Sequence, residues 1–348
     1  MPSDFAGQVL TVTGPIDPGD LGVTMAHEHV LLFLQNNPPI ALGDLARESE
    51  HVSLYARTDG NTLLSMSNYG LRWDAPGAPA PPFAPATFVE AMRKVSVDGG
   101  AQIVLGTGFY KQEWQTPRVL NMSTEDLEQR MVDDIVEGIE VIDGDPVHAG
   151  VIGEVGISTS TGDDLTDFEK RSVEASCRAA LRTGAAINFH TQIGSAWRIR
   201  ELVLDLCESF EMPLDRVMIS HLRPQVRPED ADAPSNPDTD DFLQSQLVMD
   251  RGALCSFDLI GHFGYQSADD QNAAFSIADL LNLKPKYLQQ IILSEDIYGD
   301  AEFFAQCIGY QYMTLNFCWM LNKANVTAKQ IAQMRSSNLQ RVLPLTPV

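Results

Sequence analysis

The chain has 348 residues, of which 44% are hydrophobic and 20% charged, enough apolar side chains for a sizeable core in an ordinary globular protein. Its formal net charge of -23 argues against a nucleic acid or an anionic membrane surface as partner, because both require basic patches. No apolar run approaches the roughly 18 residues of a membrane span, and the start MPSDFAGQVL lacks the features of a signal peptide. Five scattered cysteines without paired spacing indicate reduced thiols, so we expect a cytoplasmic protein.

Eight short apolar runs predict buried strands. In chain order they cover 23–31, 62–67, 102–110, 148–158, 185–192, 216–224, 253–261 and 290–299. Helical periodicity and helix-start signals fill most of the intervals between these runs. The expected helices cover 41–57, 87–98, 122–142, 166–183, 195–210, 242–251 and 277–283, with two more in the C-terminal tail, the second beginning at Thr327.

The alternation of strands and helices predicts a parallel sheet with crossover helices, and the count of eight strands predicts a closed (β/α)8 TIM barrel. No linker or charge run divides the chain, so we expect one domain over residues 1–348. Residues 1–20 predict a short hairpin at one end of the barrel, and helices are expected to follow the last strand. The Pro-rich segment 74–86 and the acidic segment 224–241 predict extended surface loops.

Two histidines stand out near the end of the first predicted strand. His27 and His29 are separated by one residue in LGVTMAHEHV, so both side chains point to the same face if the segment is extended. Two imidazoles on one face of a strand can converge on one metal ion. An isolated pair is weak evidence, since two surface histidines flanking Glu28 would give the same pattern.

Four further residues of ligand type lie near the carboxyl ends of later strands: Glu154, His190, His221 and Asp296. In a TIM barrel this is the face on which active sites are built. Each lies in an apolar run such as VIGEVGI, INFHT, MISHL or ILSED, where an unpaired ionisable group is costly. Any one of them could be a satisfied core residue, but the whole set favours a metal site.

The segments LGVTMAHEH, GEVG, FHT, ISHL and SED, in this order, resemble the phosphotriesterase-like branch of the metal-dependent amidohydrolase superfamily. The resemblance runs from GPIDPGDLG to the terminal NLQRVL, and implies a (β/α)8 barrel with two divalent ions, usually zinc. Well-known members bridge the ions with a carbamylated lysine, whereas Glu154 stands in that place here. This glutamate, together with GTGFY and SHL, is similar to the phosphotriesterase-related branch. Glu295 is a second departure, because many members have histidine there.

The resemblance assigns the six residues to two ions: a buried ion held by His27, His29 and Asp296, an exposed ion held by His190 and His221, and Glu154 as the bridge. Imidazoles and carboxylates suit Zn²⁺ first, with Mn²⁺ or Co²⁺ as alternatives. A hydroxide shared by two ions would be the nucleophile, and Asp296 is placed to take its proton. We therefore interpret Asp296 and Glu154 as the catalytic residues.

The function indicated is a binuclear metal-dependent hydrolase that attacks a small-molecule lactone, carboxylic ester or amide. A phosphotriesterase is the enzymatic alternative, because the same hydroxide could attack a phosphotriester. A non-catalytic ligand-binding barrel is the alternative of another class, distinguished by its metal content. The family's habit predicts a homodimer. The candidate substrate-binding residues follow strand ends: Tyr110, Arg223, Asp258, His262 and Tyr298.

Overall fold

The computed structural model describes residues 5–34, 40–72, 87–161, 164–222, 240–262, 270–299 and 309–346. At its centre is an eight-stranded sheet whose strands follow one another in chain order. These strands are β3 (Thr24–Glu28), β6 (Thr62–Ser65), β7 (Gln102–Thr107), β10 (Val151–Ile157), β11 (Ile187–Thr191), β12 (Val217–Ile219), β13 (Leu254–Phe257) and β14 (Ile291–Leu293). All neighbouring pairs within the sheet are parallel. Each strand lies within one of the eight predicted runs, and the TIM-barrel prediction is confirmed.

The barrel closes between its last and first strands by hydrogen bonds that lie beyond the end of β14. The Asp296 N–H donates to the His27 carbonyl at 3.1 Å, and the His29 N–H donates to the Ile297 carbonyl at 3.2 Å. The His27 N–H donates to the hydroxyl of Ser294 at 2.8 Å. These bonds therefore fix the end of β3 against the residues that follow β14, at the carboxyl edge of the barrel where the candidate ligands lie.

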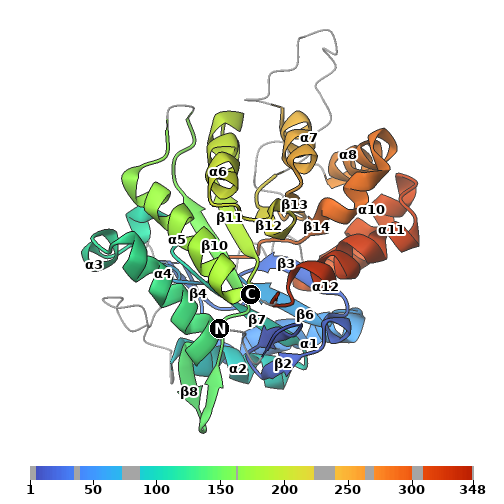
Figure 1. The fold of residues 1–348 in the computed structure, drawn as a ribbon. Helices are drawn as coiled ribbons and strands as arrows, with labels where there is room; N and C mark the ends of the chain where they lie inside the picture. Colours follow the sequence, from blue (N-terminus) through green and yellow to red (C-terminus); the bar gives the residue numbers. More distant parts are fainter. Residues whose placement is uncertain are drawn as a thin grey trace.

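Helices cover the outside of the barrel (Figure 1). They are α1 (Leu45–Thr58), α2 (Phe88–Gly99), α3 (Pro117–Leu120), α4 (Thr124–Asp133), α5 (Asp167–Thr183), α6 (Trp197–Ser209), α7 (Asp241–Arg251), α8 (Asp270–Leu283), α10 (Cys318–Lys323), α11 (Ala328–Ala332) and α12 (Asn338–Val342). Reciprocal capping boxes begin three of them, at Ser123, Thr166 and Thr327. The helix expected over 277–283 is longer than predicted, because it begins at Asp270.

One hairpin lies where a helix was expected to begin. Strands β4 (Leu32–Leu34) and β5 (Ile40–Leu42) pair antiparallel, so the helix predicted over 41–57 starts only at Leu45. Asp44 marks that start, because its side chain accepts a hydrogen bond from the Arg47 N–H and caps the helix. The residues up to Leu42 therefore belong to the hairpin, which follows the carboxyl end of β3.

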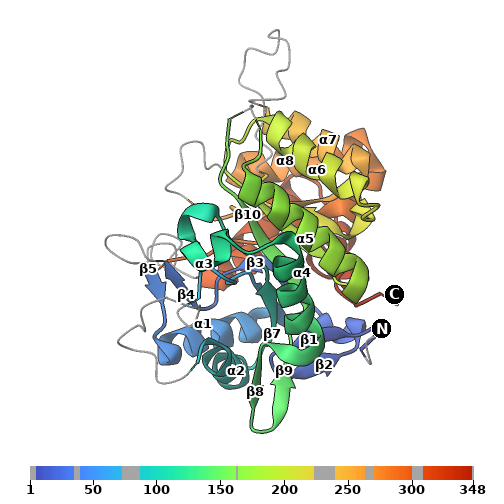
Figure 2. The same cartoon turned by 60° about the vertical axis from the view of Figure 1, so that its left-hand side comes forward.

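A second hairpin replaces the end of the helix predicted over 122–142. Strands β8 (Glu140–Ile142) and β9 (Asp145–Val147) pair antiparallel, and the helical stretch ends in a π-helical turn at Gly138. Gly138 has φ of 100°, which ends the helix, and the left-handed pair Asp143 and Gly144 forms the two-residue hairpin turn. Figure 2 shows this hairpin projecting below the barrel.

The N-terminal hairpin lies at the amino end of the barrel, where the last helix, α12, and the residues after it pack beside the N-terminal segment. Strand β1 (Val9–Thr11) pairs with β2 (Gly14–Ile16), and the Val12 N–H donates to the Ile103 carbonyl at the start of β7. The Gly7 N–H donates to the Leu345 carbonyl at 2.8 Å, which joins the two ends of the described chain. The predicted loop 74–86 and residues 224–239 of the predicted loop 224–241 lie outside the described residues.

An apolar layer fills the barrel below the candidate site. Each strand, or in one case the residue just before it, contributes one buried side chain to this layer. The eight residues are Ala26, Leu64, Val104, Val151, Ala186, Met218, Leu254 and Ile292. Leu339, Val342 and Leu343 of the C-terminal tail pack against this layer. The polar residues at the carboxyl edge therefore rest on a packed floor rather than over an open channel. Within the ranges given above, no helix has both the length and the apolarity needed to cross a bilayer.

Candidate active site

Six side chains, which we call the six-ligand cluster, gather at the carboxyl edge of the barrel: His27, His29, Glu154, His190, His221 and Asp296. They come from β3, β10 and β11 and from the turns that follow β3, β12 and β14. None of them is more than 8% exposed. Residues far apart in the sequence meet here because the carboxyl ends of all barrel strands face the same side.

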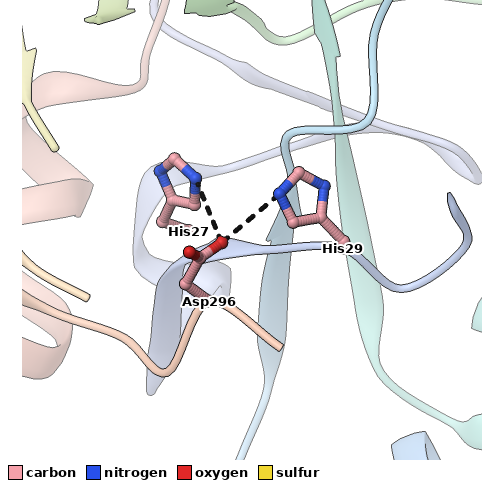
Figure 3. A group of neighbouring side chains, drawn as sticks. All are labelled: His27, His29 and Asp296. Atoms are coloured by element: carbon pink, nitrogen blue, oxygen red, sulfur yellow. Dashed lines mark ion pairs between the residues drawn. The ribbon is translucent and has the colours of Figure 1, made fainter. Parts of the chain in front are cut away.

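His27, His29 and Asp296 form the inner group of the cluster. The Nε2 atoms of His27 and His29 lie 3.5 and 3.3 Å from the same oxygen of Asp296, Oδ1 (Figure 3). One ligand atom from each of the three residues lies within 4.8 Å of the others. Such spacing suits a single cation between them, and this trio is the one that the resemblance assigns to the buried ion.

Glu154 connects the inner group to the outer histidines. Its Oε1 lies 3.3 Å from His29 Nε2, and its Oε2 lies 3.3 Å from His27 Nε2 and 2.7 Å from His190 Nδ1. His221 Nε2 is 3.8 Å from Oε2, and ligand atoms of His27, Glu154 and His221 form a second group within 4.8 Å. A carboxylate whose two oxygens face different histidines is the arrangement that a bridging ligand requires.

Some ligand atoms in this cluster are buried without a hydrogen-bond partner. They are His27 Nε2, His190 Nε2 and Asp296 Oδ1. Buried polar atoms are normally paired, because an unpaired one costs about 1–3 kcal/mol. Nitrogen and carboxylate donors that converge in this way are the set that binds Zn²⁺, and they also accept Mn²⁺ or Co²⁺. The residues present therefore fit a centre of divalent cations.

Hydrogen bonds behind three of the imidazole rings fix their orientation. The Nδ1 partners are the Ser220 hydroxyl for His27 (2.9 Å), the Ser67 hydroxyl for His29 (3.0 Å) and the Asp258 carboxylate for His221 (3.0 Å). With Nδ1 engaged, Nε2 faces the cluster. Metal-binding histidines are commonly held in this way by a partner on the far ring nitrogen.

The carboxylates of the cluster stabilise positive charge on the groups between them, as the pKa values of its residues show. Burial alone would lower the pKa of His29, but Asp296 and Glu154 raise it to about 10, and Asp258 with Asp296 raises the pKa of His221 to about 10. Burial opposes ionisation of Asp296, yet His221, His29 and His27 lower its pKa to about 2. Protons thus occupy places that cations would take, and metal binding would release them.

His190 differs from the other three histidines. Burial lowers its pKa to about 3, against the pull of the Glu154 carboxylate, and the charge of His221 acts in the same direction as burial. The ring is therefore neutral at physiological pH. A neutral imidazole is the form that donates a lone pair to a metal.

Backbone strain is concentrated at two of the six residues. His221 and Asp296 have φ of 61° and 51°, a left-handed conformation that costs a non-glycine residue of the order of 1 kcal/mol or more. The turn carrying Asp296 is held by Glu28, whose buried carboxylate accepts hydrogen bonds from the Ser294 hydroxyl (2.7 Å) and from the N–H groups of Glu295 (2.7 Å) and Ile297 (2.9 Å). These bonds keep the strained turn in place.

A pocket of about 430 Å³ opens above the cluster. Its floor includes five of the six ligands, while His27 lies below it with no exposed surface. Apolar side chains of the β4–β5 hairpin and its surroundings form much of the wall: Leu32, Leu34, Ile40, Leu71 and Ile193. The predicted residues Tyr110 and Tyr298 also line this pocket, and the Tyr110 ring lies 5.1 Å from that of His190.

Two other residues expected to contact substrate lie elsewhere. Asp258 is fully buried behind His221, where it accepts hydrogen bonds from that residue's N–H and faces its Nδ1. His262 is buried, donates to the Glu295 carbonyl and stacks on Tyr298. Neither is among the residues lining the pocket, so we assign both to holding their neighbours rather than to substrate contact. Arg223 lies outside the described residues.

Sequence reasoning missed several residues that complete the site. Ser67 and Ser220 were passed over, although each is a polar residue beside a predicted ligand or at the end of an apolar run. Lys111, which follows Tyr110, and Gln192, two residues after His190, line the pocket. Polar residues within two positions of a strand's carboxyl end were the signal for Ser67, Gln192 and Ser220, whereas Lys111 lies four positions beyond the end of β7.

The barrel and the cluster at its carboxyl edge define a TIM-barrel protein with a candidate centre for metal ions. The chain belongs to the phosphotriesterase family, whose model matches residues 7–343. It is 27% identical to a phosphotriesterase-related protein from Nematostella vectensis, over 96% of this chain and 97% of that one. An N-acetyltaurine hydrolase from Tetraodon nigroviridis is 22% identical over 97% of both chains. Among solved structures, a resiniferatoxin-binding protein from Rhodobacter sphaeroides has the same fold, with a TM-score of 0.80 and 23% identity over 100% of this chain and 99% of that one.

Proposed function

We propose that this protein is a binuclear metal-dependent hydrolase of small carbonyl compounds, namely lactones, carboxylic esters or amides. The observation that carries the proposal is the position of Glu154, whose two carboxylate oxygens face different histidines at the floor of a pocket. The relative named as an N-acetyltaurine hydrolase supports the inclusion of amides. A cytoplasmic location and a homodimer remain predictions from the sequence.

The division of the six ligands between two ions follows the family resemblance. One ion would be held by His27, His29 and Asp296, whose ligand atoms form one group, and the other by His190 and His221, with Glu154 shared. Bound divalent ions, with zinc the first expectation, would supply an activated water and a polarised carbonyl oxygen. The apolar side chains of the pocket wall would exclude water from a bound substrate, which would strengthen electrostatic interactions with the reacting group.

Asp296 is the residue placed to move the proton. Its pKa of about 2 keeps it ionised, and its Oδ1 is the oxygen without a hydrogen-bond partner. As the water oxygen bonds to the carbonyl carbon, Asp296 takes the water's proton. It then gives that proton to the leaving nitrogen or oxygen as the acyl bond breaks. Tyr110 and Tyr298 on the wall would orient the substrate.

A substrate panel on metal-loaded protein tests this proposal. The panel would contain N-acetyl amino acids, N-acetyltaurine, aryl esters, γ- and δ-lactones and a neutral phosphotriester, each assayed with Zn²⁺, Mn²⁺ and Co²⁺. We expect turnover of at least one carbonyl class, loss of that turnover in His190→Asn, and wild-type turnover in His51→Asn, a half-buried histidine of α1 outside the cluster.

Two results would replace the proposal. Turnover of the phosphotriester alone would assign the site to phosphotriester hydrolysis. Protein that binds no metal and hydrolyses nothing in the panel would point to the ligand-binding barrel, with the six residues serving another purpose.

A further inference from the structure

A single basic side chain stands in the wall of the pocket. Lys111 lines the pocket between Tyr110 and Gln192, and no other lysine or arginine is among the described lining residues. Its Nζ donates to Gln192 Oε1 at 3.0 Å and lies 5.4 Å from the centre of the Tyr110 ring. Across the described ranges, no carboxylate oxygen lies within 4.0 Å of this ammonium. Its direct contacts are therefore neutral, although the carboxylates of Glu154, Glu113 and Asp296 act on it electrostatically from more than 4.0 Å away.

The backbone beneath Lys111 is held firmly beside the cluster. The Gly156 N–H donates to the Phe109 carbonyl at 3.0 Å, and the close approach leaves no room for a side chain at Gly156, since a Cβ there would lie 2.1 Å from the Lys111 nitrogen. The Gln115 amide donates to the Tyr110 carbonyl at 2.9 Å. Lys111, in the segment that follows β7, is thus fixed against Gly156 of β10, two residues beyond Glu154, and its side chain lines the pocket from there.

The ammonium retains capacity for a ligand. An ammonium group has three donors, and Gln192 takes one of them. The side chain is partly buried, and a partly buried cation gains most from an anionic partner because solvent screening is reduced. The other wall residues are apolar or are uncharged at neutral pH, so Lys111 is the cation that an anionic group on a substrate would meet above the cluster.

We propose that Lys111 determines substrate specificity by binding an anionic group, a carboxylate or sulfonate, at the end of the substrate remote from the scissile carbonyl. This inference rests on the proposed function and narrows its substrate class to acyl compounds with an anionic tail. The anion's oxygens would accept the donors that Gln192 leaves open. A neutral substrate of the same shape would leave the ammonium without a partner, and the site would discriminate against it.

A binding experiment tests the inference without turnover. The probes are 5-oxohexanoate, in which a methylene replaces the amide nitrogen of N-acetyl-β-alanine, and its neutral counterpart 5-oxohexanamide. Calorimetry on metal-loaded wild-type protein should show tighter binding of the anion by about 10- to 100-fold, the range expected for a charged hydrogen bond. Lys111→Met should abolish the preference, Lys111→Arg should keep most of it, and Lys94→Met, an exposed lysine of α2 paired with Asp98, should not change it.

Equal binding of both probes to wild-type protein, or an undiminished preference in Lys111→Met, would overturn the inference. Turnover separates it from the proposed function. N-acetyl-β-alanine and its carboxamide would be compared in the same variants, and Lys111→Met should lower kcat/KM for the anion while leaving the carboxamide within about twofold. An anion preference in binding without hydrolysis of any carbonyl compound would reject the proposed function and leave the anion site standing. Hydrolysis of carbonyl compounds without any charge preference would support the proposed function and reject the anion site.

Discussion

Replacement of Glu28 by glutamine tests how the turn that carries Asp296 is held. The glutamine oxygen can keep the hydrogen bonds from Ser294 and Glu295, which both reach Oε1, but its amide would face the Ile297 N–H. One buried N–H would then lack an acceptor, at a cost of about 1–3 kcal/mol. For a chain of this size we expect a fall in the melting temperature of roughly 1–4 °C.

The same change should weaken metal binding, because Asp296 would no longer be held in its left-handed turn. Loss of such a supporting interaction typically lowers metal affinity about 10- to 100-fold. The assay is thermal unfolding of the metal-free protein together with zinc competition against a chromophoric chelator. Glu169→Gln is the matched control, since Glu169 is equally buried and accepts N–H groups of Ser158 and Thr166 but contacts no candidate ligand. Wild-type zinc affinity in Glu28→Gln, with stability lowered as in the control, would refute the reasoning.

Three other changes have definite expected outcomes. Asp258→Asn removes the carboxylate that raises the pKa of His221, so zinc affinity should fall about 10-fold or more in the same competition assay, and an unchanged affinity would contradict this. Gly156→Ala should lower the free energy of unfolding by about 1–3 kcal/mol, measured by urea titration, because the new Cβ would clash with the Lys111 backbone. Gly19→Ala is the control, since a Cβ there meets nothing within 4 Å and the free energy of unfolding should stay near that of the wild type. Burial lowers the pKa of His148, so the unfolded chain binds more protons and stability should fall as pH drops below about 6.5. His148→Gln should flatten that slope in urea titrations at pH 5 and 7.

The barrel could be predicted because its strands are short, apolar and regularly spaced. All eight were located, since a strand buried on both faces reads as a continuous apolar run. The hairpins β4–β5 and β8–β9 were missed for opposite reasons. Asp143-Gly144, which forms the β8–β9 turn, is a known hairpin signal, but the helical periodicity of the preceding residues favoured a longer helix. The β4–β5 pair has no such signal between its described strands.

The cluster could also be predicted, because an ionisable residue in an apolar strand is conspicuous. What could not be predicted is where side chains point after a strand ends. Asp258 directly follows β13 and turns behind His221, whereas Tyr298 follows β14 and reaches the pocket. Lys111 was overlooked because a lysine after an aromatic residue is ordinary in sequence. Its significance appears only once Gln192 and the pocket wall are seen beside it.

The central claim is a metal centre bridged by Glu154, and the most direct measurement is the metal content of purified wild-type protein and Glu154→Ala, with turnover measured on the same samples. The account predicts two divalent ions per chain in the wild type, and a loss of both metal and turnover in the variant that leaves the fold intact by circular dichroism. Two ions per chain and full turnover in Glu154→Ala would contradict the bridge. A folded wild type without metal would contradict the centre itself.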